Sequence, residues 1–92
     1  MLIDTHCHLN LLVDYTFEAP ITEATLSKAQ TIIDEAAAEN VTTIINVGTS
    51  LIESHNCVAL ARKYPRIFAS VGIHPNDLTD NWKNDLIDLE EL

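Results

Sequence analysis

The sequence predicts an α/β protein built on parallel strands, and three observations support this prediction. Short runs rich in β-branched and apolar residues occur at positions 2–9, 41–47 and 67–73, and segments with helical periodicity follow each of them. The middle run is mostly apolar on both faces, as expected for a buried parallel strand. Strands that alternate with helices favour a parallel sheet with right-handed crossovers.

The first strand is expected at residues 2–9, followed by a loop over residues 10–21. Thr22 can cap a helix that runs to about Glu39, and Asn40 is of the type that ends helices. Apolar residues at helical spacing predict one buried face on this helix, formed by Leu26, Ala29, Ile32, Ile33, Ala36 and Ala37.

The second half of the chain carries clearer signals for its helix ends. Ser50, with Glu53 three residues later, makes a full capping box for a helix that reaches about Tyr64 and stops before Pro65. A third helix is expected over residues 82–92. Its inward residues are expected to be Trp82, Leu86, Leu89 and Ile87.

Length and composition limit the functions that the chain can have. Its 92 residues make one small domain, and five Lys and Arg against fourteen Asp and Glu give a net charge of −9. Such a surface repels nucleic acid unless cations intervene. No apolar run approaches the ~20 residues of a membrane span. We expect a cytoplasmic protein in which Cys7 and Cys57 are free thiols.

Two histidines at the end of the first strand form a candidate metal site. Alternate strand residues share a face, so His6 and His8 can converge on one cation, with Asp4 below them. The same pair could instead be polar strand residues with ordinary hydrogen bonds. Asp4 could orient a ligand or make a local strand-end hydrogen bond. Cys7 lies on the opposite face, and we expect it to be a buried thiol.

His74 directly follows the third strand and therefore lies on the same rim as the histidine pair. Parallel α/β folds build their sites at this rim, which makes His74 a candidate functional residue. A single histidine in a loop can also be structural. His55 lies within the second helix, where we expect a surface or packing role.

Two motifs resemble the TatD family of metal-dependent deoxyribonucleases: "MLIDTHCHLN" at the start and "SVGIHPND" at residues 70–77. The resemblance implies a (β/α)₈ barrel that hydrolyses DNA phosphodiester bonds, with two divalent ions in the complete enzyme (Mg, Zn or Mn). It also implies that His6 and His8 are metal ligands and that His74 lies in the substrate pocket near the phosphate. Asn10 departs from the family pattern, which usually has Asp there.

The chain corresponds to the first three βα units of such a barrel, which needs about 250 residues. The later Glu, His and Asp positions of the family have no counterpart in residues 1–92. We therefore expect little turnover by this chain alone, and association with the rest of a barrel or with itself. Two alternatives stay open: a non-catalytic metal-binding or complementing fragment, and a hydrolase of amide or ester bonds on the same scaffold.

Overall fold

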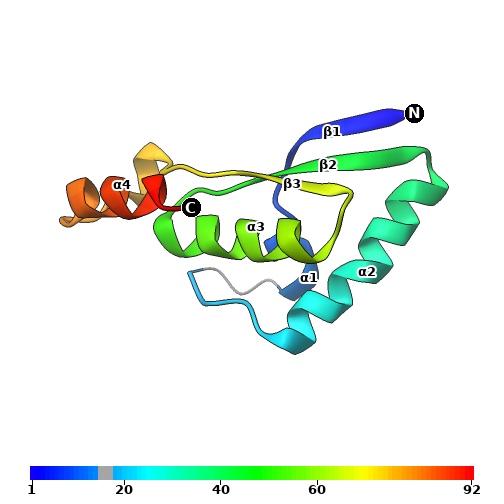
Figure 1. The fold of residues 1–92 in the computed structure, drawn as a ribbon, viewed down its shortest axis with the longest axis horizontal. Coiled ribbons are helices and arrows are strands. Elements are labelled where there is room, and N and C mark those ends of the chain that lie inside the picture. The colour runs from blue at the N-terminus through cyan, green and yellow to red at the C-terminus, as the bar shows by residue number, and fades with distance from the viewer. Residues whose placement is uncertain (15–17) are drawn as a thin grey trace.

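The computed structural model describes residues 1–14 and 18–92 and contains one parallel sheet. Its strands are β1 (Leu2–Cys7), β2 (Val41–Val47) and β3 (Ile67–Ser70), in the spatial order β1-β2-β3. β2 pairs in parallel with both neighbours, and the three strands run side by side in Figure 1. The prediction of an α/β protein with a parallel sheet is confirmed.

The helices of the main body lie on one face of this sheet. They are α1 (Leu9–Asp14), α2 (Glu23–Ala38) and α3 (Leu51–Lys63), and Figure 1 shows them together below the strands. Beyond β3 come a short 3₁₀ helix (Pro75–Asp77) and α4 (Trp82–Glu90), which projects beyond the ends of the strands. In the part of the chain that is described, the opposite face of the sheet carries no helix. A sheet with helices on its outer face is consistent with the start of a (β/α)₈ barrel.

The predicted helix ends are largely confirmed. Thr22 and Ser50 each accept a hydrogen bond, of 3.2 Å, from the backbone N–H three residues later. Asn40 follows the cap of α2 with a φ of 68°, the left-handed conformation that ends helices. α3 stops because Tyr64, which precedes Pro65, is extended.

The start of the chain differs from the prediction. β1 ends at Cys7, whereas the sequence predicted a strand over residues 2–9. The prediction of a loop over residues 10–21 is wrong for residues 10–14, which belong to α1. The helix begins here because the His8 carbonyl accepts hydrogen bonds from the N–H groups three and four residues later. Residues 15–17 of the predicted loop lie outside the described residues.

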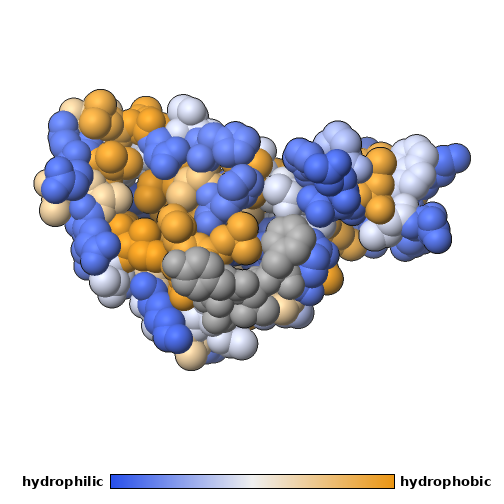
Figure 2. All heavy atoms as spheres, turned by 180° about the vertical axis from the view of Figure 1, so that it is seen from behind, coloured by the Kyte–Doolittle hydropathy of each residue, from blue (hydrophilic) through white to orange (hydrophobic). Residues whose placement is uncertain are grey.

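The end of the chain also needs correction. β3 stops at Ser70, whereas a strand over residues 67–73 was predicted. In α4 only Leu89 is buried, and the prediction of three further inward residues is wrong: Trp82, Leu86 and Ile87 are 40%, 45% and 60% exposed. The reason is that α4 packs on α3 at the end of the body, with no strand beneath it. Figure 2 shows an apolar strip among hydrophilic side chains on this projecting part.

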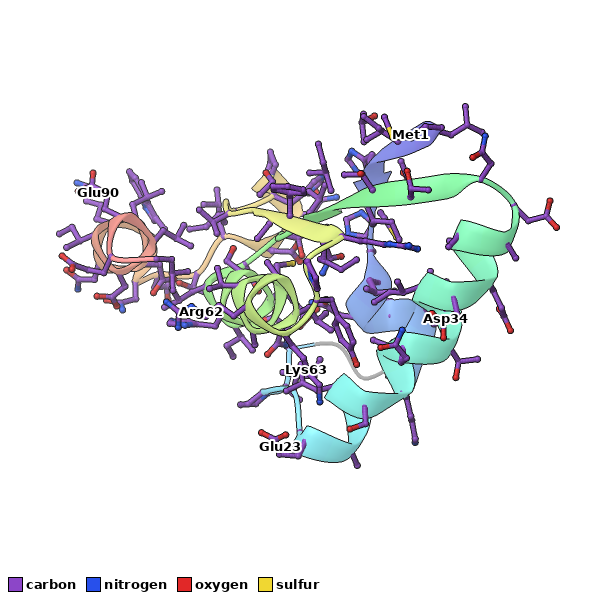
Figure 3. The ribbon with its side chains drawn as sticks, turned by 45° about the vertical axis from the view of Figure 1, so that its right-hand side comes forward. Met1, Glu23, Asp34, Arg62, Lys63 and Glu90 are labelled. Atoms are coloured by element: carbon purple, nitrogen blue, oxygen red, sulfur yellow. The ribbon has the colours of Figure 1, made fainter. Side chains whose placement is uncertain are left out.

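The hydrophobic core fills the space between the sheet and the three body helices. Cys7 belongs to it, as predicted from strand alternation, together with Leu9, Ala29, Ile33, Ile44, Leu60, Tyr64 and Ile67. The charged side chains labelled in Figure 3 lie on the outer surfaces of the helices, away from this core. Among the described residues, no helix is both long and apolar enough to cross a membrane.

Candidate active site

The two histidines lie at the end of β1, His6 within the strand and His8 directly after it, next to a β-bulge. Asp4 pairs with Ile44 and Cys7 pairs with Asn46, so three steps along β1 match two steps along β2. The extra residue of β1 breaks strict alternation, and such bulges commonly redirect side chains next to active sites. The rings of His6 and His8 lie edge to face, with centroids 5.1 Å apart.

His8 is held in one orientation by the neighbouring strand. Its Nδ1 lies 3.1 Å from the carbonyl oxygen of Val47, the last residue of β2. Because a carbonyl can only accept, Nδ1 carries the proton and donates it. The lone pair of a neutral His8 ring is then on Nε2. Hydrogen bonds of this kind fix the tautomer of histidines that bind metals. His8 is half-buried, while His6 is exposed.

His74 is held in the opposite tautomer. Its Nδ1 accepts a hydrogen bond of 3.1 Å from the backbone N–H of Asn76, because the ring caps the short 3₁₀ helix. A neutral ring that accepts at Nδ1 carries its proton on Nε2. The backbone N–H of His74 also donates to the Thr49 carbonyl at 2.7 Å. His74 therefore presents a donor, where His8 presents a lone pair.

The three histidines line one cavity at the C-terminal ends of the strands. This cavity has a volume of about 420 Å³, and its other walls come from residues 47–49 and 70–75. His8 and His74 also line a neighbouring cavity of about 310 Å³, together with Glu53 and Asp77. Within residues 1–14 and 18–92, no three His, Cys, Asp or Glu side chains are grouped closely enough to hold a metal. The described part of the site therefore offers the histidine pair as nitrogen ligands.

Asp4 makes a local hydrogen bond in the structure. Its Oδ1 accepts from the backbone N–H of His6 at 3.0 Å, and the side chain is exposed. This bond corresponds to the strand-end alternative considered for Asp4, and it supports the backbone at the bulge. A role in orienting a metal ligand stays a prediction. His55 is exposed on α3, as expected.

The two cysteines are buried free thiols, as predicted. Burial raises the pKa of Cys7, and the nearby charge of Asp4 adds to the rise. Burial also raises the pKa of Cys57, to about 11. A hydrogen bond with Asn10 lowers this pKa, but by less than burial raises it. Both thiols are therefore protonated near neutral pH and are poor nucleophiles.

Sequence reasoning missed a buried polar network beside the histidines. Asn10, Asn46 and Glu53 are 7%, 0% and 2% exposed, although Glu53 was expected only to cap a helix. The capping box is half confirmed: Ser50 accepts from Glu53 N, while the Glu53 carboxylate accepts from Asn10 and Asn56. Positions 53, 56, 57 and 60 have the spacing of a buried helix face, but Glu53 and Asn56 are polar, so hydrophobicity gave no signal for it.

A sheet of parallel strands with a histidine pair at its C-terminal rim is typical of metal-dependent hydrolases of the barrel class. Comparison with known proteins agrees: the family model described as TatD related DNase matches residues 3–92, and the chain belongs to this family.

The chain is 32% identical over its whole length to the uncharacterized metal-dependent hydrolase YabD of Bacillus subtilis, and spans 32% of that protein. It is 38% identical over 82% of its length to an uncharacterized metal-dependent hydrolase of Mycoplasma genitalium, spanning 24% of it. It is 31% identical over 80% of its length to an uncharacterized metal-dependent hydrolase of Buchnera aphidicola, spanning 25% of it. The chain thus spans about a third or less of the length of these relatives.

Proposed function

We propose that this chain provides the first metal ligands and a substrate contact of a metal-dependent phosphodiesterase that cleaves DNA. The observation that supports the proposal is the cavity lined by His6, His8 and His74, because the hydrogen bonds at Nδ1 leave His8 with a lone pair and His74 with an N–H donor at Nε2. The membership of the TatD-related DNase family supports the choice of substrate.

In this proposal His6 and His8 hold a divalent cation, with His8 binding through Nε2. A cation bound there would lower the pKa of a water molecule and polarise a phosphoryl oxygen. The Nε2–H group of His74 donates to a phosphate oxygen across the cavity. A second divalent ion and its ligands belong to the complete enzyme, and Mg, Zn and Mn are all candidates. Asp4 steadies the bulge that carries His6.

The net charge of −9 bears on how DNA is bound. An acidic protein gains little from counterion release, because this gain comes from Lys and Arg residues that neutralise phosphates. For the residues of this chain, the proposal therefore requires that contact with DNA depend on the divalent ion. DNA affinity should fall with chelation.

The test uses the whole protein as its cell makes it, because this chain spans about a third of the length of its relatives. Plasmid cleavage is measured with Mn²⁺ and with a chelator. His6→Ala and His8→Ala should abolish cleavage. His74→Ala should reduce kcat/KM about 100-fold, the effect of losing one donor to a reacting oxyanion. His55→Ala is the matched control, since His55 is exposed on α3 and lines neither cavity.

Two outcomes would contradict the proposal. Cleavage that survives His6→Ala and His8→Ala would show that the pair does not hold the catalytic ion. Turnover of ester or amide substrates, with none of DNA, would favour the alternative hydrolase on the same scaffold. The 92-residue chain should itself show little turnover under the same conditions, because its described residues hold no group of three or more His, Cys, Asp or Glu side chains that could bind a metal.

A further inference from the structure

We infer that Asn46, a buried side chain of β2, is a positioning residue that sets the orientation of His8. It does so as one member of a buried polar relay that ends at the Glu53 carboxylate. The inference rests on the proposed function only in treating His8 as a metal ligand. The relay itself consists of Leu9 N–H, Asn46, Asn10 and Glu53.

Asn46 and Val47 are consecutive in β2 and hold two consecutive residues at the end of β1. The Asn46 Oδ1 accepts from the backbone N–H of Leu9 at 2.8 Å, and its side chain is 0% exposed. The Val47 carbonyl accepts from the ring of His8. One strand thereby fixes both the imidazole and the peptide group that follows it.

The direction of every hydrogen bond in the relay is determined. The Leu9 N–H can only donate, so Asn46 turns Oδ1 toward it and donates through Nδ2 to Asn10 Oδ1, at 2.8 Å. Asn10 must then donate through Nδ2, and it faces the Glu53 carboxylate, which can only accept, at 3.4 Å. A half-turn of either amide would place like groups together, so both amides are locked.

This arrangement holds the peptide group between His8 and Leu9 at both of its ends. The carbonyl oxygen accepts from Leu11 and Leu12, at 3.1 and 3.3 Å, in the first turn of α1. The N–H of the same peptide group, that of Leu9, donates to Asn46. Without Asn46 this peptide group is held at its carbonyl end alone and can tilt, and the ring loses its fixed approach to the Val47 carbonyl. The lone pair on His8 Nε2 would then no longer be pre-oriented.

The experiment compares Asn46→Leu with Asn56→Leu in the whole protein. Asn56 is the matched control because it is also buried, at 5% exposed, and donates to the Glu53 carboxylate at which the relay ends, at 2.8 Å. Its remaining bonds go to Ala19 and Ile21, away from His8. Both variants should lose stability. Nitrogen-15 NMR of the histidine rings at pH 8 reports which ring nitrogen carries the proton.

Only Asn46→Leu should shift His8 from the Nδ1–H toward the Nε2–H tautomer. It should also weaken Zn²⁺ binding, measured by calorimetry, by up to about 10- to 100-fold, the range seen when the hydrogen bond that orients a metal ligand is lost. Should Asn46→Leu prevent folding, Asn46→Ala serves for the same measurements. The inference is overturned if His8 and Zn²⁺ affinity match the unmodified protein, or if Asn56→Leu changes them equally. Loss of DNA cleavage activity does not enter this test, so a failure of the proposed function would be seen separately.

Discussion

The relay makes a strong prediction about positions 10 and 53, which face each other in the buried network. Asn10→Asp should destabilise the protein severely on its own, and much less when Glu53→Gln is also present. In the unmodified protein, Asn10 Nδ2 donates to Glu53 Oε2 at 3.4 Å. Asn10→Asp replaces this donor with a carboxylate oxygen. Two buried acceptors, both able to carry negative charge, would then face each other.

The size of the effect follows from this distance. Two unit charges 3.4 Å apart repel by about 5 kcal/mol at an effective dielectric constant of about 20. The variant can avoid this by holding one proton between the two carboxyl groups. At pH 7 this costs about 4 kcal/mol, since an ordinary carboxyl group has a pKa near 4. We therefore expect a loss of about 3–4 kcal/mol at pH 7.

The loss should depend on pH with a definite sign. The folded variant binds a proton that its unfolded chain releases above about pH 4, so its stability falls as the pH rises. The deficit should shrink by about 1.4 kcal/mol for each unit from pH 7 toward pH 5. In the double variant, the amide introduced at position 53 can donate to the carboxylate introduced at position 10, while the amide oxygen accepts from Asn56. The double variant therefore keeps the hydrogen bonds of the relay, with its carboxylate at position 10 and its amide at position 53.

Guanidinium unfolding of four proteins measures this coupling: the unmodified protein, each single variant and the double variant. Glu53→Gln alone should cost about 1–3 kcal/mol, because an amide donor would face the Asn10 donor. The double variant should lie within about 1 kcal/mol of the unmodified protein, so the coupling energy should reach about 3 kcal/mol or more. Additive losses, or an Asn10→Asp variant whose deficit does not change with pH, would refute the reasoning.

Two other predictions concern the packing of α3. Gly48→Ala should cost about 1–3 kcal/mol, because a Cβ at Gly48 would lie 2.8 Å from Ser54 Cα. Gly72→Ala is its control: its nearest neighbour would be 3.9 Å away, so thermal unfolding should show no loss. The Cys57 thiol, with its pKa of about 11, should react very slowly with a disulfide reagent at pH 8 and rapidly in denaturant. Rapid modification of the folded protein would contradict its burial.

The sequence predicts the sheet and the position of the histidines because both depend on local patterns. The β-branched run of β2 and the caps of α2 and α3 are signals contained within a few residues. His6, His8 and His74 share one cavity because the ends of parallel strands meet at one rim. The β1 bulge and α1 were missed. Both depend on pairing with β2, in particular on Asn46 holding the Leu9 N–H, which no pattern near residue 9 reveals.

The buried polar face of α3 could not be predicted from hydrophobicity. A helix usually buries its apolar residues, yet α3 buries Glu53, Ser54 and Asn56, while Ile52 is 36% exposed. Ser54 explains part of this reversal, because its hydroxyl donates to the Gly72 carbonyl and accepts from the Gly72 N–H, at 3.2 and 3.1 Å. These bonds tie α3 to the segment that leads to His74. The helix thus uses its buried polar groups to hold strand ends in place.

The buried network also explains why Asn10, a departure from the pattern of the family it resembles, fits this chain. The residue at position 10 must accept from Asn46 and face the group at position 53. Where position 53 is a buried carboxylate, an amide meets both demands, whereas a second carboxylate would be repelled. The residue at position 10 therefore has to be considered together with the residue at position 53, because the two side chains share a buried hydrogen bond. A chain with Asp at position 10 should have an uncharged residue, or a donor, at the position of Glu53.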